Sequence, residues 1–152
     1  LRDIAPNRLV FAPHIEQADH LARHRLADLF LDTLPYNAHT TASDALWAGL
    51  PVITCLGSTF AGRVAASLLD AVGLPELITH SLGEYEALAL KLGTDGQALA
   101  AIKAKLARNR TTHPLFDTDR FCRHIEAAYV AMWERAQRGE KPASFAVDPI
   151  AT

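Results

Sequence analysis

Apolar and polar positions in the first third of the chain alternate between short apolar runs and longer stretches with helical spacing. The apolar runs have the length and composition of buried strands and occupy residues 8–12, 29–32 and 51–55. Residues 16–26 place their apolar side chains on one side, as an amphipathic helix does. A second helix is expected to begin with Thr40 or Thr41 as its N-cap and to stop at Gly49. This order predicts βαβ units in a parallel sheet.

The second half of the chain has mainly helical periodicity. Helices are predicted at residues 61–72, 82–92, 96–109 and 118–138, with a weak strand at 76–79. The last helix carries an apolar stripe that we expect to pack on the core, formed by Phe121, Ile125, Ala128, Tyr129 and Met132. The predicted fold class is therefore α/β, a Rossmann-like parallel sheet with flanking helices that becomes helical towards the C-terminus. One domain is expected over residues 1–138, followed by a tail at 139–152 that lies over a surface or is mobile.

Composition and charge narrow the class of protein. A chain of 152 residues with 49% apolar and 21% charged residues is typical of one globular domain. The formal charge of -2 predicts no general affinity for nucleic acid or an anionic membrane. No apolar run approaches the roughly 20 residues of a membrane span, and the start has no signal-peptide pattern. Cys55 and Cys122 form neither a disulfide framework nor a metal-ligand spacing, so we expect a soluble protein of the reducing cytoplasm.

The loop at residues 35–41 carries the candidate chemistry, because ligands bind outside the carboxyl ends of strands in an open parallel sheet. A helix that begins at Thr41 would direct its free N–H groups and partial positive charge towards a phosphate. Thr40 and His39 would add side-chain donors. Asp44 lies early in the same helix and could accept hydrogen bonds from the paired hydroxyls of a ribose. Together these residues indicate a site for a nucleotide diphosphate.

Other candidate residues leave alternatives open. His20 and Arg23 lie one helical turn apart and could offer a stacking surface and donors to a base, although histidines on a polar face are often only solvated. Similarly, a Thr-Thr pair before an apolar helix is often only a cap. Arg63 could reach the same crevice or pair with a carboxylate. Asp28 and Asp32 border a strand without forming a carboxylate cluster. No Gly-rich phosphate loop and no metal-ligand spacing is present, which argues against a dinucleotide enzyme, a P-loop nucleotidase and a bound metal.

Motifs along nearly the whole chain, up to about Phe145, form a more specific pattern. They are LADLFLDT at 26–33, YNAHTT at 36–41, DALWAGLP at 44–51, RVAAS at 63–67, EY at 84–85, KLGTD at 91–95, PLFD at 114–117 and MWE at 132–134. This pattern resembles the O-linked N-acetylglucosamine transferases and their SPINDLY-like relatives, glycosyltransferase family 41. The resemblance implies the C-terminal lobe of a two-lobed GT-B enzyme that follows tetratricopeptide repeats and uses UDP-N-acetylglucosamine without a metal. Because the chain starts with Leu1 and reaches a strand pattern almost at once, we expect it to begin inside a longer protein, with this lobe incomplete at its N-terminus.

The resemblance also implies the roles of particular residues. The diphosphate is assigned to His39, Thr40 and Thr41, the ribose to Asp44 and Gln17, and the base to Ile15, His20 and Arg23. Gln17 stands where the animal enzymes have a lysine. No catalytic residue is expected in this segment, because the first lobe, the acceptor site and a lysine that neutralises the diphosphate lie upstream.

The implied activity of the parent protein is inverting transfer of N-acetylglucosamine to Ser or Thr hydroxyl groups of a protein acceptor, which would bind through the missing regions. The segment alone is expected to be inactive. Two alternatives remain at this stage. One is the lobe of a related fucosyltransferase that uses GDP-fucose, and the other is a non-catalytic module that serves packing or interaction.

Overall fold

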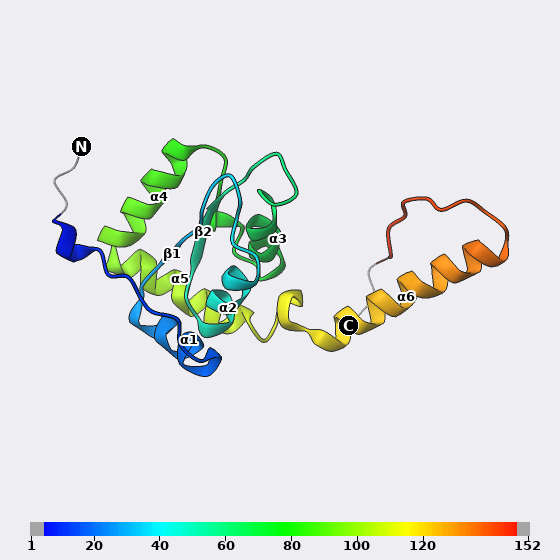
Figure 1. Cartoon of the computed structure of the whole chain (residues 1–152), viewed down its shortest axis with the longest axis horizontal. Helices are drawn as coiled ribbons and strands as arrows, with labels where there is room; N and C mark the ends of the chain where they lie inside the picture. Colours follow the sequence, from blue (N-terminus) through cyan, green and yellow to red (C-terminus); the bar gives the residue numbers. More distant parts are fainter. Residues whose placement is uncertain (1–4, 149–152) are drawn as a thin grey trace.

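A computed structural model describes residues 5–148 and has a parallel sheet of three short strands at its centre (Figure 1). The strands are β1 (Phe30–Leu31), β2 (Val52–Cys55) and β3 (Ile78–Thr79), in the order β1-β2-β3. Phe30 pairs with Val52, and Thr54 pairs with Ile78. The hydroxyl of Thr79 also donates to the main-chain carbonyl of Thr54 at 2.9 Å, which links β3 to β2. The predicted α/β class with a parallel sheet is confirmed.

Helices flank this sheet close to the predicted positions. They are α1 (Gln17–Arg23), α2 (Thr40–Ala48), α3 (Val64–Ala71), α4 (Leu82–Thr94), α5 (Gly96–Asn109) and α6 (Thr118–Gln137), and 3-10 turns occupy Pro6–Arg8, His24–Leu26, Pro75–Leu77 and Pro114–Phe116. Helices α2 and α3 pack on each other and on β2. Helix α4 packs on β2 and β3 and also contacts α5. In Figure 1, β2 lies between α3 and α4. All four residues of β2 are buried, which explains why this strand reads as a continuous apolar run.

The core lies between these layers and is built almost entirely from aliphatic side chains. Its fully buried members include Leu46, Ile53, Leu69, Val72, Leu77 and Leu106. They come from α2, the sheet, α3 and the turn that follows it, and α5, so burial of these side chains holds the helices on the strands. Among residues 5–148, no helix is both long and apolar enough to cross a membrane.

Helix α5 covers the side of the sheet where the strands begin. The ammonium of Lys103 donates to Asp28, which precedes β1, at 2.8 Å. The side-chain amide of Asn109 donates at 2.9 Å to the carbonyl of Val72, which lies between α3 and β3. Because α5 occupies the amino ends of the strands, the loops at their carboxyl ends are left free to form a site.

Residues 8–12 do not form the strand that their apolar run predicts. They follow the turn Pro6–Arg8, and no strand in the described part of the chain pairs with them. Val10 and Phe11 are 87% and 92% exposed. An apolar run becomes a strand only where a neighbouring strand supplies hydrogen bonds and a core covers one face, and residues 5–148 provide neither here.

The apolar stripe of α6 does not pack on the core, contrary to prediction. Figure 1 shows α6 projecting away from the sheet, with the tail running back beside it. No residue of α6 is buried, and Phe121 and Tyr129 remain 65% and 60% exposed. Met132 and Phe145 line a small hollow of about 200 Å³ between the helix and the tail, which is described as far as residue 148. The periodicity predicted the helix correctly, but it could not say what covers the apolar face.

Candidate functional site

The carboxylate of Asp32, directly after β1, holds the loop that leads into α2. Oδ1 accepts the main-chain N–H of Thr33 at 2.8 Å and that of Ala38 at 2.6 Å. Oδ2 accepts the hydroxyl of Thr54 in β2 at 2.6 Å, and Asp32 is only 5% exposed. Because one oxygen binds both ends of the loop at residues 33–38, the chain curls back against the end of β1 and delivers the start of α2 at a set place.

Tyr85 anchors the same position from the other face of the sheet. Its hydroxyl, on α4, donates to the main-chain carbonyl of Asp32 at 2.9 Å. Burial raises the pKa of Tyr85 to about 12, and the nearby negative charge of Asp32 contributes. The phenol therefore keeps its proton and its hydrogen bond at neutral pH.

The loop after β2 packs against the loop after β1. The main-chain N–H of Asn37 donates to the carbonyl of Ala61 at 3.0 Å, and the N–H of Gly57 donates to Gly62 at 2.7 Å. A Cβ on Gly62 would lie 3.2 Å from the carbonyl oxygen of Pro35. Glycine at this position thus permits the close approach of the two loops.

His39 is the N-cap of α2, so the prediction of Thr40 or Thr41 in that role is wrong. Its backbone, with φ -106° and ψ -90°, is not helical, whereas Thr40 and Thr41 already belong to the first turn. The His39 ring stacks on Tyr36 with centroids 5.0 Å apart, and its Nε2 lies 3.4 Å from the carbonyl of Ala61. These contacts fix the imidazole where the loop at residues 33–38 ends and α2 begins.

The first turn of α2 has no side-chain cap. Ser81 and Asp95 cap α4 and α5 by accepting main-chain N–H groups, so α2 differs from these two helices. Thr40 and Thr41 are exposed at its start, and Asp44 is half-buried one turn further along. An uncapped helix start with exposed hydroxyls is well suited to receive an anion.

The predicted base-binding residues and Gln17 meet in one hollow at the start of α1. This hollow, of about 460 Å³, is lined by Ile15, Gln17, His20 and Arg23 together with His14 and Glu16. The guanidinium of Arg23 donates to the carbonyl of Pro13 at 2.8 Å, which ties the preceding segment to α1. The structure therefore brings together the three residues assigned to the base and Gln17, whereas Asp44, which was assigned to the ribose with Gln17, does not line this hollow.

His24 follows α1 and contacts its last turn. The residue is buried, and its Nδ1 lies 2.9 Å from the carbonyl of His20. The helix changes to a 3-10 turn at His24. The His20 and His24 rings meet edge to face, with centroids 4.9 Å apart.

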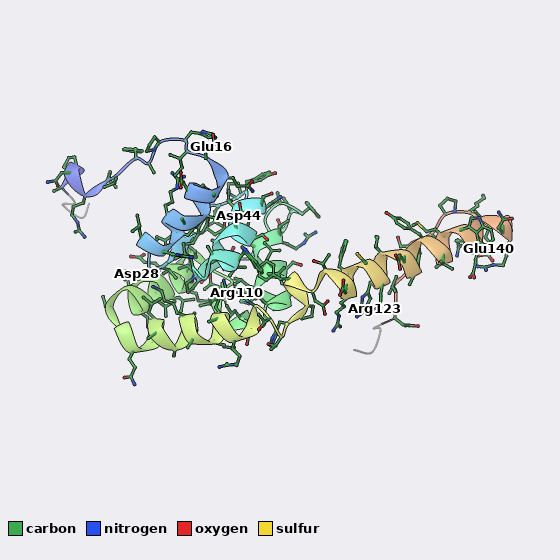
Figure 2. All side chains as sticks on the ribbon, turned by 90° about the horizontal axis from the view of Figure 1, so that it is seen from below. Glu16, Asp28, Asp44, Arg110, Arg123 and Glu140 are labelled. Carbon is green, nitrogen blue, oxygen red and sulfur yellow. The ribbon has the colours of Figure 1, made fainter. Side chains whose placement is uncertain are left out.

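The hollow and the start of α2 belong to two helices that contact each other. Helices α1 and α2 pack together, and Figure 2 shows Asp44 on α2 close to α1, with Glu16 at the beginning of α1. The lining of the hollow does not include His39, Thr40, Thr41 or Asp44. The predicted site residues thus form two groups, one at α1 and the segment before it and one at the start of α2.

Arg63 binds within its own loop. Its guanidinium donates to the carbonyl of Ser58, and the side chain is exposed. Among residues 5–148 no ion pair joins Arg63 to a carboxylate. Within residues 5–148, no three His, Cys, Asp or Glu side chains gather as metal ligands would.

Sequence reasoning missed Asp32, Tyr36 and Tyr85. Asp32 carried one usable signal, since an acidic residue directly after a buried strand lies at the edge where ligands bind. Tyr36 and Tyr85 lie in the motifs at 36–41 and 84–85, but no pattern indicated their partners, which depend on how the loop and α4 are placed in space.

Comparison with known proteins identifies the class of this chain. A profile described as glycosyl transferase family 41 matches residues 1–125. A UDP-N-acetylglucosamine–peptide N-acetylglucosaminyltransferase of Caenorhabditis elegans is 41% identical over 91% of this chain and 12% of its own length. A probable enzyme of the same name, SEC, from Arabidopsis thaliana is 40% identical over 95% of this chain and 15% of its own length.

A solved structure agrees. A mutant O-GlcNAc transferase of Thermobaculum terrenum superposes with a TM-score of 0.85 at 38% identity, covering 91% of this chain and 26% of the other. The chain thus spans roughly an eighth to a quarter of the length of these proteins. The similarity extends over both helices of the candidate site and over the sheet that carries them, and the chain belongs to glycosyltransferase family 41.

Proposed function

We propose that this chain is the donor-binding part of an inverting protein O-N-acetylglucosaminyltransferase that acts on Ser and Thr hydroxyl groups. The observation that carries the proposal is the uncapped start of α2 at His39, presented by a loop tied to the sheet, on a helix that packs against α1 and its hollow-lining residues. The names of the relatives support UDP-N-acetylglucosamine as the donor.

Each part of the nucleotide has a matching group in this proposal. His39, Thr40 and Thr41 bind the diphosphate through donors and the positive end of the helix dipole. Asp44 and Gln17 bind the ribose hydroxyls, and Ile15, His20 and Arg23 bind the base. The same donors at the start of α2 stabilise the charge that develops on UDP as it departs, which is where this segment contributes to the transfer step.

The proposed parent protein supplies the remaining parts. These are a first GT-B lobe with the catalytic groups, tetratricopeptide repeats and the site for the protein acceptor. This chain spans only a small part of the length of its relatives, which supports a longer parent. The exposed apolar stripe of α6 supports it too, since exposed apolar surface of this kind often marks an interaction site. We place this enzyme in the cytoplasm and assign it no metal.

The test uses the longer protein with His39→Ala and Asp44→Ala. Each change should raise the Kd for UDP by about 10- to 100-fold, because a hydrogen bond to a charged group is worth about 1.5–3 kcal/mol. His80→Ala and Asp70→Ala remove the same side-chain types from exposed positions outside the site and serve as matched controls. Affinity and transfer that survive in all four variants would instead support a non-catalytic module.

A competition between UDP and GDP addresses the donor. UDP should displace a labelled UDP-sugar from the longer protein at lower concentration than GDP. The reverse order would favour a fucosyltransferase that uses GDP-fucose. The 152-residue chain alone should show no transfer from UDP-N-acetylglucosamine to a peptide, and measurable turnover would contradict its role as a donor-binding part.

A further inference from the structure

We propose that Asp32 is a positioning residue for the nucleotide diphosphate, which it does not itself contact. This proposal rests on the proposed function. The carboxylate sits behind the loop and has its oxygens occupied by the N–H groups of Thr33 and Ala38 and the hydroxyl of Thr54. The negative carboxylate of Asp32 would repel a diphosphate rather than bind it. Asp32 therefore contributes through the shape that it gives the loop.

The three groups around the carboxylate all donate, which explains why a carboxylate is needed. An ionised carboxylate accepts on both oxygens, and charge-assisted hydrogen bonds of 2.6 Å, such as that from Ala38, are strong ones. An asparagine could keep one accepting oxygen for Thr33 and Ala38. Its NH2 group would then face the hydroxyl of Thr54, whose proton would lose its acceptor.

The carboxylate is itself fixed to the sheet from two directions. Thr54 in β2 holds Oδ2, and Tyr85 on α4 holds the main-chain carbonyl of the same residue. Ala38, which Oδ1 holds, is the residue immediately before His39, the N-cap of α2. Asp32 is therefore the residue that links the position of His39 to the sheet. Because displacements of about 1 Å reduce binding and catalysis strongly, loss of this link should be felt at the diphosphate.

The first experiment measures the Kd for UDP in the longer protein. Asp32→Ala should raise this Kd by roughly 10-fold or more, and Thr54→Val, which loses only the bond to Oδ2, should raise it less. Asp32→Asn should fall between wild type and Asp32→Ala because it keeps an acceptor for the loop. Thr79→Val is the matched control: it removes another buried threonine hydroxyl, which donates to the main chain of β2 and, within residues 5–148, forms no hydrogen bond with the loop at residues 33–38. It should leave the Kd unchanged.

The second experiment needs no nucleotide and uses the 152-residue chain. An amide proton held at a short distance by a carboxylate resonates far downfield, so the amide of Ala38 should do so in a ¹H–¹⁵N spectrum. The signal should move upfield in Asp32→Ala and stay in place in Thr79→Val. An Ala38 amide at an ordinary position in the wild type would overturn the proposed geometry.

The outcomes separate the two proposals. A wild-type protein that shows the downfield Ala38 amide but binds no UDP overturns the proposed function, and with it the role of Asp32 in binding. A wild type that binds UDP, with Asp32→Ala and Thr54→Val no weaker than Thr79→Val, overturns the positioning role alone. If Asp32→Ala does not fold, the comparison of Thr54→Val with Thr79→Val decides.

Discussion

The side-chain amide of Asn109, at the end of α5, donates to the main-chain carbonyl oxygens of Val72 at 2.9 Å and Gly73 at 3.2 Å. Val72 is the C-cap of α3, and Gly73 begins the turn towards β3. Asn109 is buried, so water does not compete for these acceptors. One side chain thus satisfies the end of α3 and fixes α5 to the amino edge of the sheet.

Asn109→Ala should lower the free energy of unfolding by about 1–3 kcal/mol, because two carbonyl groups at the end of α3 lose their buried donor. Urea denaturation followed by circular dichroism measures the change. Arg108→Ala alters the exposed neighbouring residue of α5 and should shift the free energy by no more than about 0.5 kcal/mol. Equal effects from the two substitutions would contradict the role assigned to Asn109.

Gly73→Ala should destabilise the protein by about 1–3 kcal/mol, because the backbone at Gly73 has φ +71°. An added Cβ would also lie 2.4 Å from the ring of His113. Gly93→Ala in α4 meets nothing within 4 Å and should instead stabilise by about 0.5–1 kcal/mol. Thermal unfolding of both variants checks the opposite signs.

A double-mutant cycle separates the two causes at Gly73. His113→Ala combined with Gly73→Ala relieves the contact with the ring but leaves the positive φ. Part of the destabilisation should therefore remain in the double variant. Full recovery would show that the backbone conformation costs nothing at this position.

The raised pKa of Tyr85 predicts that the folded protein loses stability at alkaline pH. Its pKa is about 12 in the folded chain against an ordinary value of 10.0, so between these values the unfolded chain gives up the phenolic proton while the folded chain keeps it. The contribution of Tyr85 is thus fully present below pH 10 and falls as pH rises towards 12. In denaturation series, wild type and Tyr85→Phe should differ by a constant amount below pH 10, and this difference should shrink above it. Tyr129→Phe, on α6, controls for the loss of a phenol, and a difference that grows above pH 10 would refute the prediction.

Removal of residues 118–152 should leave the core intact, because no residue of α6 is buried. The midpoint of urea unfolding should change little. Leu106→Ala in α5, at a fully buried position, should by contrast cost about 2–5 kcal/mol. A truncated chain that unfolds as readily as Leu106→Ala would show that α6 supports the core after all.

Local pattern was sufficient for most of the elements and for part of the site. The run at 51–55 and the periodicity at 96–109 correspond closely to β2 and α5, because a central strand and a capped helix leave strong local signals. Ile15, His20 and Arg23, which were assigned to the base, line one hollow together with Gln17, which was assigned to the ribose. Their roles towards a nucleotide, like those of His39, Thr40, Thr41 and Asp44, stay predictions.

The failures share a physical cause. Residues 8–12 and α6 have apolar side chains that could pack against another surface. The sequence pattern of these segments does not show which surface that is. In the described chain neither pattern meets that surface, so Phe11 and Phe121 remain exposed.

By itself, the sequence determined the order of strands and helices and the α/β class, because spacing, caps and glycines act over a few residues. Only the tertiary structure decided that Asp32, Thr54 and Tyr85 converge and that His39 rather than a threonine is the N-cap of α2. Asp32 and Tyr85 are far apart in the chain and meet only because α4 packs across the parallel sheet. Such hydrogen bonds depend on packing, which no local pattern encodes.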